Sequence, residues 1–571
     1  MKLRNYLFPA ALALLCFSPA AWSNDNSAPE RVLYNAKVFT AEPGQPYADA
    51  VAIRGDKIVA VGSRSEVIKA VSKSAELVDL QGKMLLPGLI DSHTHPIHGG
   101  LALISADIGE NVKSLDELVA FAAEAKKTGK GMRGDILYIS GIPLAFWSKP
   151  EELNAKFNAG AYAEQALFLH GMDGHTGWAN RALLRRAGIT RDFLSHLPEA
   201  ERKYYGYAAD LEPNGFGVDA GLRKIQAIVP TPAKEQLLEA GRAALHYNNS
   251  LGITAWLDAI ADPSTLATYR SLSERGELTA HVAAFPRIEP RNDPDQELAT
   301  VQKLRQEFKG VPNLTMPGLK VFADGVVEYP SQSAALSKPY RNTGRNGDLL
   351  FDPARFAKLV IAADKQGLIV HIHAIGDLAV KETLNGIEAA RRANGDSGLP
   401  HTITHLQLID AEDIPRFRQL GVIAAFQLYW AAANADAIDL VKPYIDPAIF
   451  PLQYPARSLL NSGATISGAS DWSVSTANVF EAIYQAETRK GPLGVLNPDE
   501  RMPREAMLYA YTRNSARALG QQDRIGSIAP GKQADLVLVD RDVLTVPPEE
   551  LRETRVLWTM VGGRTVYRAE P

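Results

Sequence analysis

The chain has 571 residues, of which 46% are hydrophobic, with 61 Lys and Arg against 65 Asp and Glu. This length exceeds what one hydrophobic core usually serves, and the ordinary composition excludes a disordered, collagen-like or coiled-coil protein. The net charge of −4 offers no electrostatic footprint for nucleic acid or an anionic membrane. We therefore expect a globular protein whose partner is a small molecule, with no nucleic-acid partner.

The first 23 residues have the pattern of a secretory signal. Lys2 and Arg4 precede a short apolar run at 7–17, and Ala21-Trp22-Ser23 is a small-x-small cleavage site. The run is too short to span a bilayer, and no later stretch reaches the roughly 18 apolar residues of a membrane-spanning helix. We therefore predict a signal peptide at 1–23, export to the periplasm and no membrane insertion.

Cysteine usage limits the chemistry of the mature chain. The only cysteine, Cys16, lies inside the predicted signal. Disulfides, thiolate metal sites and a cysteine nucleophile are therefore excluded after cleavage. Any metal must be held by histidine, carboxylate or a less usual group.

Short strand-like runs separated by turns occur at both ends of the chain. One set lies within residues 24–87 and the other within 516–571. Neither set has enough strands for a stable sheet alone. We therefore predict one small β-sandwich domain built from both ends.

Residues 88–515 alternate apolar strand-like runs with helical stretches, which is the pattern of a parallel α/β fold. Eight such runs predict a (β/α)8 TIM barrel. The interval of about 101–250 is too long for one helix and its loops, so we expect an insertion after the first barrel strand. The eight runs are Leu89–His95, Ile253–Asp258, His281–Arg287, Leu319–Asp324, Leu368–His373, Thr402–Leu406, Val422–Gln427 and Thr465–Asp471.

Several of these runs end in metal-ligand side chains. His93 and His95 end the first run, and residues i and i+2 of a strand point to the same face. Active sites of such barrels lie at the C-terminal ends of the strands, so the joint occurrence favours a metal centre over separate buried polar groups. Ligands of this kind suit Zn²⁺, and also Mn²⁺ or Fe²⁺. The comparable groups on other runs are His371, His373, His405 and Asp471.

Lys320 lies within the fourth run between apolar residues. A barrel-lining lysine is costly unless its charge is paired or removed. One interpretation is an ion pair with Asp324. The other is carbamylation of the amine by CO₂, which creates a carboxylate able to bridge two metal ions.

Six segments resemble the amidohydrolase superfamily and, within it, the YtcJ-like or amidohydrolase-3 group. They occur in the family's order, and Trp472 departs from the group's pattern because a small residue more usually follows the last aspartate. The segments are Met84–Pro96, Leu319–Gly325, His373–Asp377, Thr404–Gln407, Gly468–Asp471 and Gly526–Leu536.

The resemblance implies two divalent ions, with Zn²⁺ as the first choice. Asp471 would both bind an ion and act as general base. His371 has no ligand role in the group, so it would support a ligand instead. The implied ligands are His93, His95 and Asp471 for the more buried ion, His373 and His405 for the second ion, and carbamylated Lys320 as the bridge.

The insertion contains Asp173–Asn180, a segment that is similar to one lying over the barrel mouth in this group. His175 could orient a substrate carbonyl there, or cap a helix that begins near Asn180. Aromatic residues near the strand ends suggest an apolar or aromatic substrate, whereas Arg341 and Arg345 could hold a carboxylate or face solvent. The candidate substrate contacts are His175, Trp178, His371 and Trp472.

These observations predict a hydrolase of carbon–nitrogen bonds other than peptide bonds. It would cleave an N-acyl or N-formyl amine or a cyclic amide with a metal-activated water and Asp471 as general base and acid. A lactonase, deaminase or isomerase on the same scaffold is the alternative, although a deaminase typically uses one metal and has no need of Lys320. A non-catalytic secreted ligand-binding barrel is disfavoured by the intact ligand set. The oligomeric state and the substrate's identity are not readable from the sequence.

Overall fold

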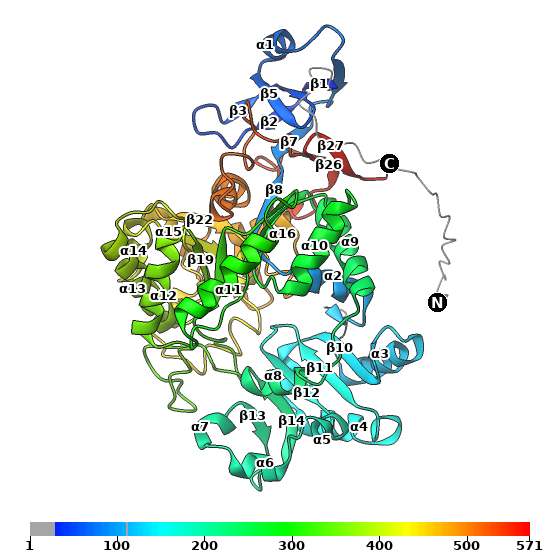
Figure 1. The fold of residues 1–571 in the computed structure, drawn as a ribbon, viewed down its shortest axis with the longest axis vertical. Coiled ribbons are helices and arrows are strands. Elements are labelled where there is room, and N and C mark those ends of the chain that lie inside the picture. The colour runs from blue at the N-terminus through cyan, green and yellow to red at the C-terminus, as the bar shows by residue number, and fades with distance from the viewer. Residues whose placement is uncertain (1–28, 110–111, 113, 571) are drawn as a thin grey trace.

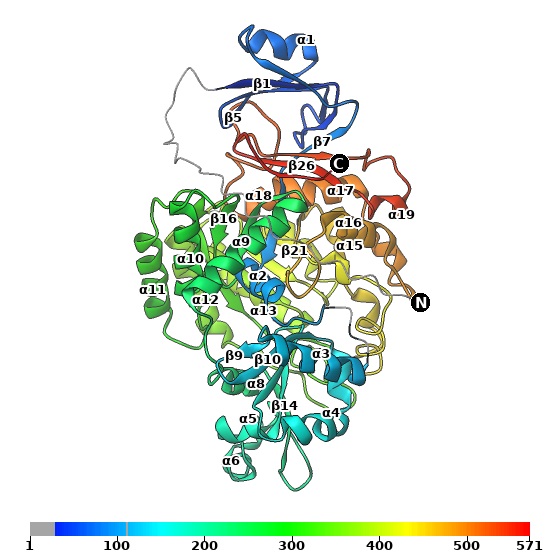
Figure 2. The ribbon, with the colours of Figure 1, turned by 90° about the vertical axis from the view of Figure 1, so that its right-hand side faces the viewer.

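The structure is a computed structural model that describes residues 29–109, 112 and 114–570. The predicted signal peptide at 1–23 lies outside the described residues. No helix in the described part of the chain combines the length and apolar character needed to cross a membrane. A central α/β part lies between a small β part and the insertion, as Figures 1 and 2 show from two sides.

Each of the eight predicted runs contains a strand of the central part. The strands form two parallel sheets, in the orders β17-β16-β15-β8 and β18-β19-β20-β21-β22. The first sheet comprises β8 (Leu89–Thr94), β15 (Ile253–Asp258), β16 (His281–Ala284) and the short β17 (Leu314–Thr315). The second comprises β18 (Gly318–Phe322), β19 (Ile369–Ala374), β20 (Thr402–His405), β21 (Ile423–Phe426) and β22 (Thr465–Gly468).

The two parallel sheets continue into each other at both edges. On one side the Lys320 amide donates to Pro286 O (2.9 Å) and the Ile288 amide donates to Lys320 O (3.0 Å). On the other side, the Asp471 amide donates to His93 O at 2.8 Å, just beyond the end of β22. This continuity is consistent with the eight strands closing on themselves.

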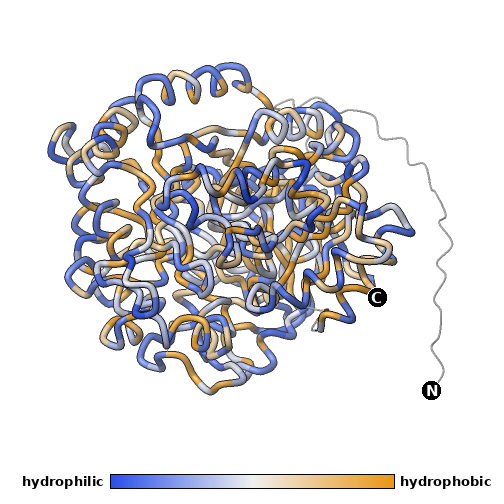
Figure 3. The backbone as a smooth tube through the Cα atoms, turned by 90° about the horizontal axis from the view of Figure 1, so that it is seen from below, coloured by the Kyte–Doolittle hydropathy of each residue, from blue (hydrophilic) through white to orange (hydrophobic). Residues whose placement is uncertain are grey.

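The strands of the central part are buried on both faces, which explains their near-continuous apolar sequences. A helix follows each of the eight principal strands and covers the outside of the sheets, so apolar segments gather in the interior (Figure 3). A further helix, α9 (Lys234–Ser250), packs against the first of them. The eight helices that follow the principal strands are α2 (Pro96–Ile104), α10 (Pro263–Glu274), α11 (Pro294–Glu307), α12 (Pro353–Lys365), α13 (Asp377–Asn394), α14 (Ile414–Gln419), α15 (Ala456–Asn461) and α16 (Val479–Thr488).

Strands from the two ends of the chain pair with each other. β7 (Met84–Pro87) lies antiparallel to β25 (Leu536–Val539) inside the six-stranded sheet β27-β26-β25-β7-β2-β3. A four-stranded sheet, β5-β4-β1-β6, shares a hydrophobic cluster with it. The other strands are β1 (Glu30–Tyr34), β2 (Lys37–Phe39), β3 (Tyr47–Ala48), β4 (Ala50–Arg54), β5 (Lys57–Gly62), β6 (Glu76–Asp79), β26 (Val556–Val561) and β27 (Arg564–Arg568).

The insertion has a sheet of its own, with the order β13-β14-β12-β11-β10-β9. Two hydrophobic clusters lie on this sheet, so the insertion has its own core. The strands are β9 (Met132–Arg133), β10 (Ile136–Ile142), β11 (Leu167–Gly171), β12 (Thr176–Ala179), β13 (Tyr205–Tyr207) and β14 (Pro213–Val218). The helices are α3 (Leu115–Thr128), α4 (Pro150–Phe157), α5 (Arg181–Arg186), α6 (Arg191–His196), α7 (Glu199–Arg202) and α8 (Ala220–Gln226).

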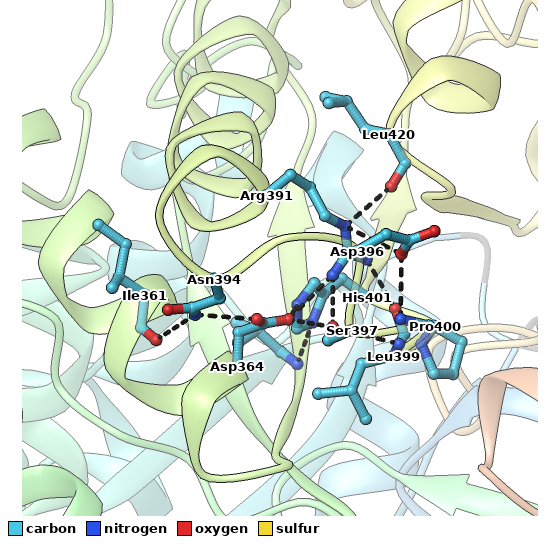
Figure 4. A network of polar contacts seen from close by, with 12 residues as sticks. Ile361, Asp364, Arg391, Asn394, Asp396, Ser397, Leu399, Pro400, His401 and Leu420 are labelled. Carbon is cyan, nitrogen blue, oxygen red and sulfur yellow. Dashed lines mark hydrogen bonds and ion pairs between the residues drawn. The ribbon is translucent and has the colours of Figure 1, made fainter.

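A buried polar network ties the start of β20 to α12 and α13 (Figure 4). The Asp364 carboxylate accepts hydrogen bonds from His401 Nε2 (2.9 Å) and Arg391 Nη1 (2.9 Å). Ser397 and Asn394 donate to the same carboxylate. Although burial opposes ionisation, these donors lower the pKa of Asp364 below its ordinary value of 3.8. The ionised carboxylate therefore stabilises the folded chain.

We expect Asp364→Asn to destabilise the protein by about 3 kcal/mol at pH 7, because it leaves buried donors facing a neutral group. The lowered pKa means that the carboxylate's stabilisation is complete above its ordinary value of 3.8 and is lost as the pH falls below it. Thermal unfolding at pH 7 and pH 3.5 should therefore show a wild-type advantage that narrows at the lower pH. Asp396→Asn is the control, because the Asp396 side chain is 86% exposed. Equal midpoints for wild type and Asp364→Asn at pH 7 would contradict this role.

Candidate metal centre

The predicted ligands converge at the C-terminal ends of the central strands. His93 lies in β8 and His95 directly follows it, whereas Asp471 lies three residues after the end of β22. Within the described residues, the carboxylate of Asp471 and single ring nitrogens of His93 and His405 all lie within 4.8 Å of one another. The structure thus brings together side chains from the first and last strands of the central part.

His95 Nε2 lies 2.9 Å and His93 Nε2 lies 3.2 Å from the same Asp471 atom, Oδ1. Despite these short distances, Asp471 Oδ1 makes no hydrogen bond of good geometry with any described residue. Three donor atoms that lie close together without hydrogen bonding to one another are arranged as ligands of one shared cation would be.

His371 contacts His93 from behind. Its Nε2 lies 2.6 Å from His93 Nδ1, and the two rings stack with centroids 4.9 Å apart. This hydrogen bond orients the His93 ring so that its Nε2 faces Asp471. Supporting contacts of this kind fix the tautomer and orientation of metal-binding histidines.

His373 and His405 lie side by side, with ring centroids 4.4 Å apart. His373 Nε2 hydrogen bonds to Gly325 O at 2.9 Å, and His405 Nδ1 hydrogen bonds to Gln427 Oε1 at 3.1 Å. One nitrogen of each ring is therefore engaged by the protein, and the other is left for a ligand. Trp430 stacks on His405, with nearly parallel rings.

The backbone is strained at two of these candidate ligands. His405 has a φ of 79° and Asp471 a φ of 57°, both in the left-handed region that favours glycine. Such conformations cost on the order of 1 kcal/mol or more each and cluster at functional sites. The strain is therefore a second, independent indication that these two positions serve chemistry.

Lys320 is completely buried, and its Nζ has no hydrogen-bond partner among the described residues. Burial lowers its pKa to about 7. The ion pair with Asp324, one of the two interpretations of the sequence, is not formed. Asp324 instead accepts backbone hydrogen bonds from Ala335 (3.0 Å), Ile375 (3.0 Å) and Gly376 (2.8 Å).

The charge states of the cluster match those of metal ligands. Burial and then the Lys320 charge lower the pKa of His93 to about 3. Burial also lowers the pKa of His373 and of His405 well below the ordinary value. Burial opposes ionisation of Asp471, but the neighbouring His93 and His95 lower its pKa well below the usual range. Neutral imidazoles and an ionised carboxylate are the forms that bind metal ions.

Two buried carboxylates that position the cluster were missed as site residues from the sequence. Asp91 accepts hydrogen bonds from Ser470 Oγ (2.5 Å), the Ser470 amide (3.1 Å) and the His93 amide (3.2 Å). It thereby ties β8 to the segment that carries Asp471. Asp324 accepts hydrogen bonds from the amides of Ile375 and Gly376 and thereby ties the segment after β18 to the turn after His373. Both stood inside the recognised segments, but only the folded backbone shows which amides they reach.

A cavity of about 1460 Å³ opens over the cluster and is lined by the strand ends and by the insertion. His175 reaches it from the insertion, with its ring centroid 5.4 Å from that of His373. Its Nδ1 lies 2.8 Å from Asp219 Oδ1, and it does not cap the following helix, because Asn180 itself does so.

The other candidate substrate contacts lie elsewhere. Trp178 is fully buried in the core of the insertion. Trp472 stacks on Tyr247 with centroids 4.8 Å apart, and His371 lies behind His93. None of the three is among the residues that line the cavity.

The residues present fit a divalent metal ion. Four imidazoles and an ionised carboxylate surround a buried amine, and donor atoms of His95, Lys320 and Asp471 have no hydrogen-bond partner among the described residues. Unpaired buried polar atoms are costly. A bound cation, together with modification of the Lys320 amine, would give these polar atoms partners.

Comparison with known proteins identifies the family. A sequence model described as "Amidohydrolase family" matches residues 76–567. The chain is 29% identical to Protein LONG AFTER FAR-RED 3 of Arabidopsis thaliana, over 93% of this chain and 91% of that protein. It is 26% identical to N-substituted formamide deformylase of Arthrobacter pascens, over 94% of this chain and 98% of that enzyme. It is also 26% identical to the putative amidohydrolase YtcJ of Bacillus subtilis, over 90% and 96% of the two chains.

Solved structures show the same fold. An uncharacterized metal-dependent hydrolase from Pyrococcus horikoshii aligns with a TM-score of 0.70 at 24% identity, over 91% of this chain and 99% of that one. A similar protein from Pyrococcus furiosus aligns with a TM-score of 0.67 at 23% identity, over 90% and 100%. The resemblance deduced from the six sequence segments is thus confirmed.

We expect His93→Ala and Asp471→Ala to abolish bound metal and turnover, because each removes a group from the shared cluster. His371→Ala should retain metal and lose about 10–100-fold in activity, since it removes only the hydrogen bond that orients His93. Elemental analysis of purified variants and initial rates measure the two effects. A loss of metal in His371→Ala equal to that in His93→Ala would show that His371 is itself a ligand.

Proposed function

Since the chain belongs to the amidohydrolase family, we propose that it is a metal-dependent hydrolase of an amide-type carbon–nitrogen bond. The observation that carries this proposal is the convergence of four imidazoles and one carboxylate on the lining of a large cavity, beside one buried amine. Its substrate would be a small N-acyl or N-formyl amine or a cyclic amide. The likeness to a formamide deformylase over nearly the whole chain supports this bond type.

The proposed metal site holds two divalent ions, with Zn²⁺ as the first choice. When bound, such ions polarise a carbonyl group and lower the pKa of water. The proposed ligands are His93, His95 and Asp471 for one ion, His373 and His405 for the other, and Lys320 as a carbamylated bridge. Carbamylation joins the neutral amine nitrogen to the carbon of CO₂ and releases one proton, which gives a carboxylate in place of an ammonium.

The proton transfers are assigned to Asp471. Its carboxylate is ionised and lines the cavity, so it can accept a proton from the attacking water. The same group can return that proton to the departing amine nitrogen. His175, held by Asp219 beside His373, is placed to donate a hydrogen bond to the substrate carbonyl.

The finer architecture and the location are also proposals. The continuity of the two parallel sheets supports a (β/α)8 barrel over residues 88–515. The pairing of β7 with β25 and the shared cluster support a β-sandwich domain built from 24–87 and 516–571. The pattern at 1–23 supports secretion to the periplasm.

A substrate panel with metal analysis tests the function. We expect the mature protein to copurify with a divalent metal, to hydrolyse one or more N-acyl amines, N-formyl amines or cyclic amides, and to lose this activity on chelation. Colorimetric detection of the released amine and elemental analysis provide the readouts. Turnover confined to lactones or to aminopurines, or full activity in metal-free protein, would overturn the proposal.

Lys320→Ala should lose one metal ion and most activity. Added short carboxylates such as acetate should restore part of both, because they can occupy the space of the missing carbamate. Lys320→Arg should not be rescued, since the guanidinium fills that space and keeps its charge. Carbamates lose CO₂ in acid, so peptide mass spectrometry does not detect the modification. It is instead followed by ¹³C NMR of the intact protein supplied with ¹³CO₂. An active wild type with no carbamate signal and one metal would contradict the two-metal site.

A further inference from the structure

Arg287 projects into the cavity without a partner. It directly follows Pro286, and its backbone pairs with Lys320 where the two parallel sheets meet. Its guanidinium forms no hydrogen bond or ion pair with any residue that the structure describes, although it lines the cavity. Its Cζ lies over the ring of Phe322, 4.9 Å from the ring centroid.

A second guanidinium faces the same place from the insertion. Arg223, on α8, lines the cavity and likewise has no side-chain hydrogen bond or ion pair in the described part of the chain. Both side chains are exposed along the open cavity, where partial desolvation and then the charge of Arg223 lower the pKa of Arg287. The two like charges, one from each side of the cavity, repel each other, and an anion bound between them would relieve this repulsion.

The nearby carboxylates do not neutralise this pair. The charges of Glu289 and Asp219 raise the pKa of Arg287, but neither carboxylate lies within ion-pair range of the Arg287 guanidinium. Asp219 is engaged by His175 Nδ1 at 2.8 Å. Both guanidinium groups are therefore without an ion-pair partner among the described residues and are available to an anionic group of a ligand.

The arginine pair lies close to the proposed reaction centre. Phe322, which contacts Arg287, also contacts His373, with ring centroids 5.0 Å apart. An anion held by Arg287 is thus separated from a proposed metal ligand by a single aromatic ring. This spacing suits an acid group a few bonds away from the scissile carbonyl.

We propose that Arg287 and Arg223 bind the carboxylate of an N-acyl amino acid, so that the substrates of this enzyme are acids rather than neutral amides. The planar guanidinium fork matches a carboxylate with two parallel hydrogen bonds. This assignment replaces the candidates suggested by the sequence, since Arg341 and Arg345 do not line the cavity. It rests on the proposed amide hydrolysis and adds the substrate class to it.

A matched pair of substrates isolates the acid group. N-acetylphenylalanine (racemic) and N-acetyl-2-phenylethylamine share the scissile bond and the phenyl ring, and only the first has a carboxylate. We expect the wild type to show at least a tenfold higher kcat/KM for the acid. Arg287→Gln and Arg223→Gln should each reduce this preference at least fivefold, mainly by loss of turnover of the acid, with little change for the neutral amide.

Two further variants separate charge recognition from structural damage. Arg287→Lys should recover part of the preference, because it keeps the charge but not the fork. Arg275→Gln, at the exposed end of α10 and outside the cavity, removes the same charge and should leave the preference unchanged. A wild type that prefers the neutral amide, or an Arg287→Gln protein with an unaltered preference, would overturn the proposal.

Binding distinguishes failure of this inference from failure of the proposed function. If the metal-loaded wild type hydrolyses neither compound, amide hydrolysis of such substrates fails, and calorimetric titration with N-acetylphenylalanine decides the arginine site alone. Binding to the wild type that weakens at least fivefold in Arg287→Gln supports the site. Equal binding to both proteins, or equal wild-type affinity for the acid and the neutral amide, contradicts it.

Discussion

The candidate site depends on one set of contacts, in which the segment after β22 hydrogen bonds to the end of β8. The Asp471 amide donates to His93 O at 2.8 Å, and the His95 amide donates to Trp472 O at 2.8 Å. Asp91 strengthens this junction by accepting hydrogen bonds from the amide and the hydroxyl group of Ser470. Because these contacts join the first and last principal strands, they bring the only carboxylate of the cluster against its two nearest imidazoles.

Burial then determines the chemistry that the junction can support. Desolvation lowers the pKa of His93, His373 and His405, which keeps these imidazoles neutral, and it lowers the pKa of Lys320 to about 7. A buried amine at that value is a better nucleophile toward CO₂ than an exposed lysine, since more of it is unprotonated. The apolar strands thus do more than stabilise the fold, because the same desolvation prepares the side chains for a cation.

The insertion completes the cavity rather than the metal cluster. Its sheet and helices bring His175, Asp219 and Arg223 over the strand ends, where Arg287 of the central part lines the same cavity. The candidate metal ligands all come from the central α/β part, whereas residues of both parts line the cavity. This division agrees with the general finding that one scaffold serves many substrates by varying the segments over its active-site face.

Several features followed from the sequence alone, because they depend on local patterns. The eight apolar runs, the spacing of His93 and His95, and the segments shared with the amidohydrolase family were sufficient to predict the strands, the family and the clustered residues. Other features depend on distant segments and have no local signal. Three such features are the partners of Asp91 and Asp324, the stacking of Trp472 away from the cavity, and the lack of an ion-pair partner for Arg287 among the described residues. Side-chain periodicity records which face a residue occupies, but burial and charge pairing are properties of the whole fold.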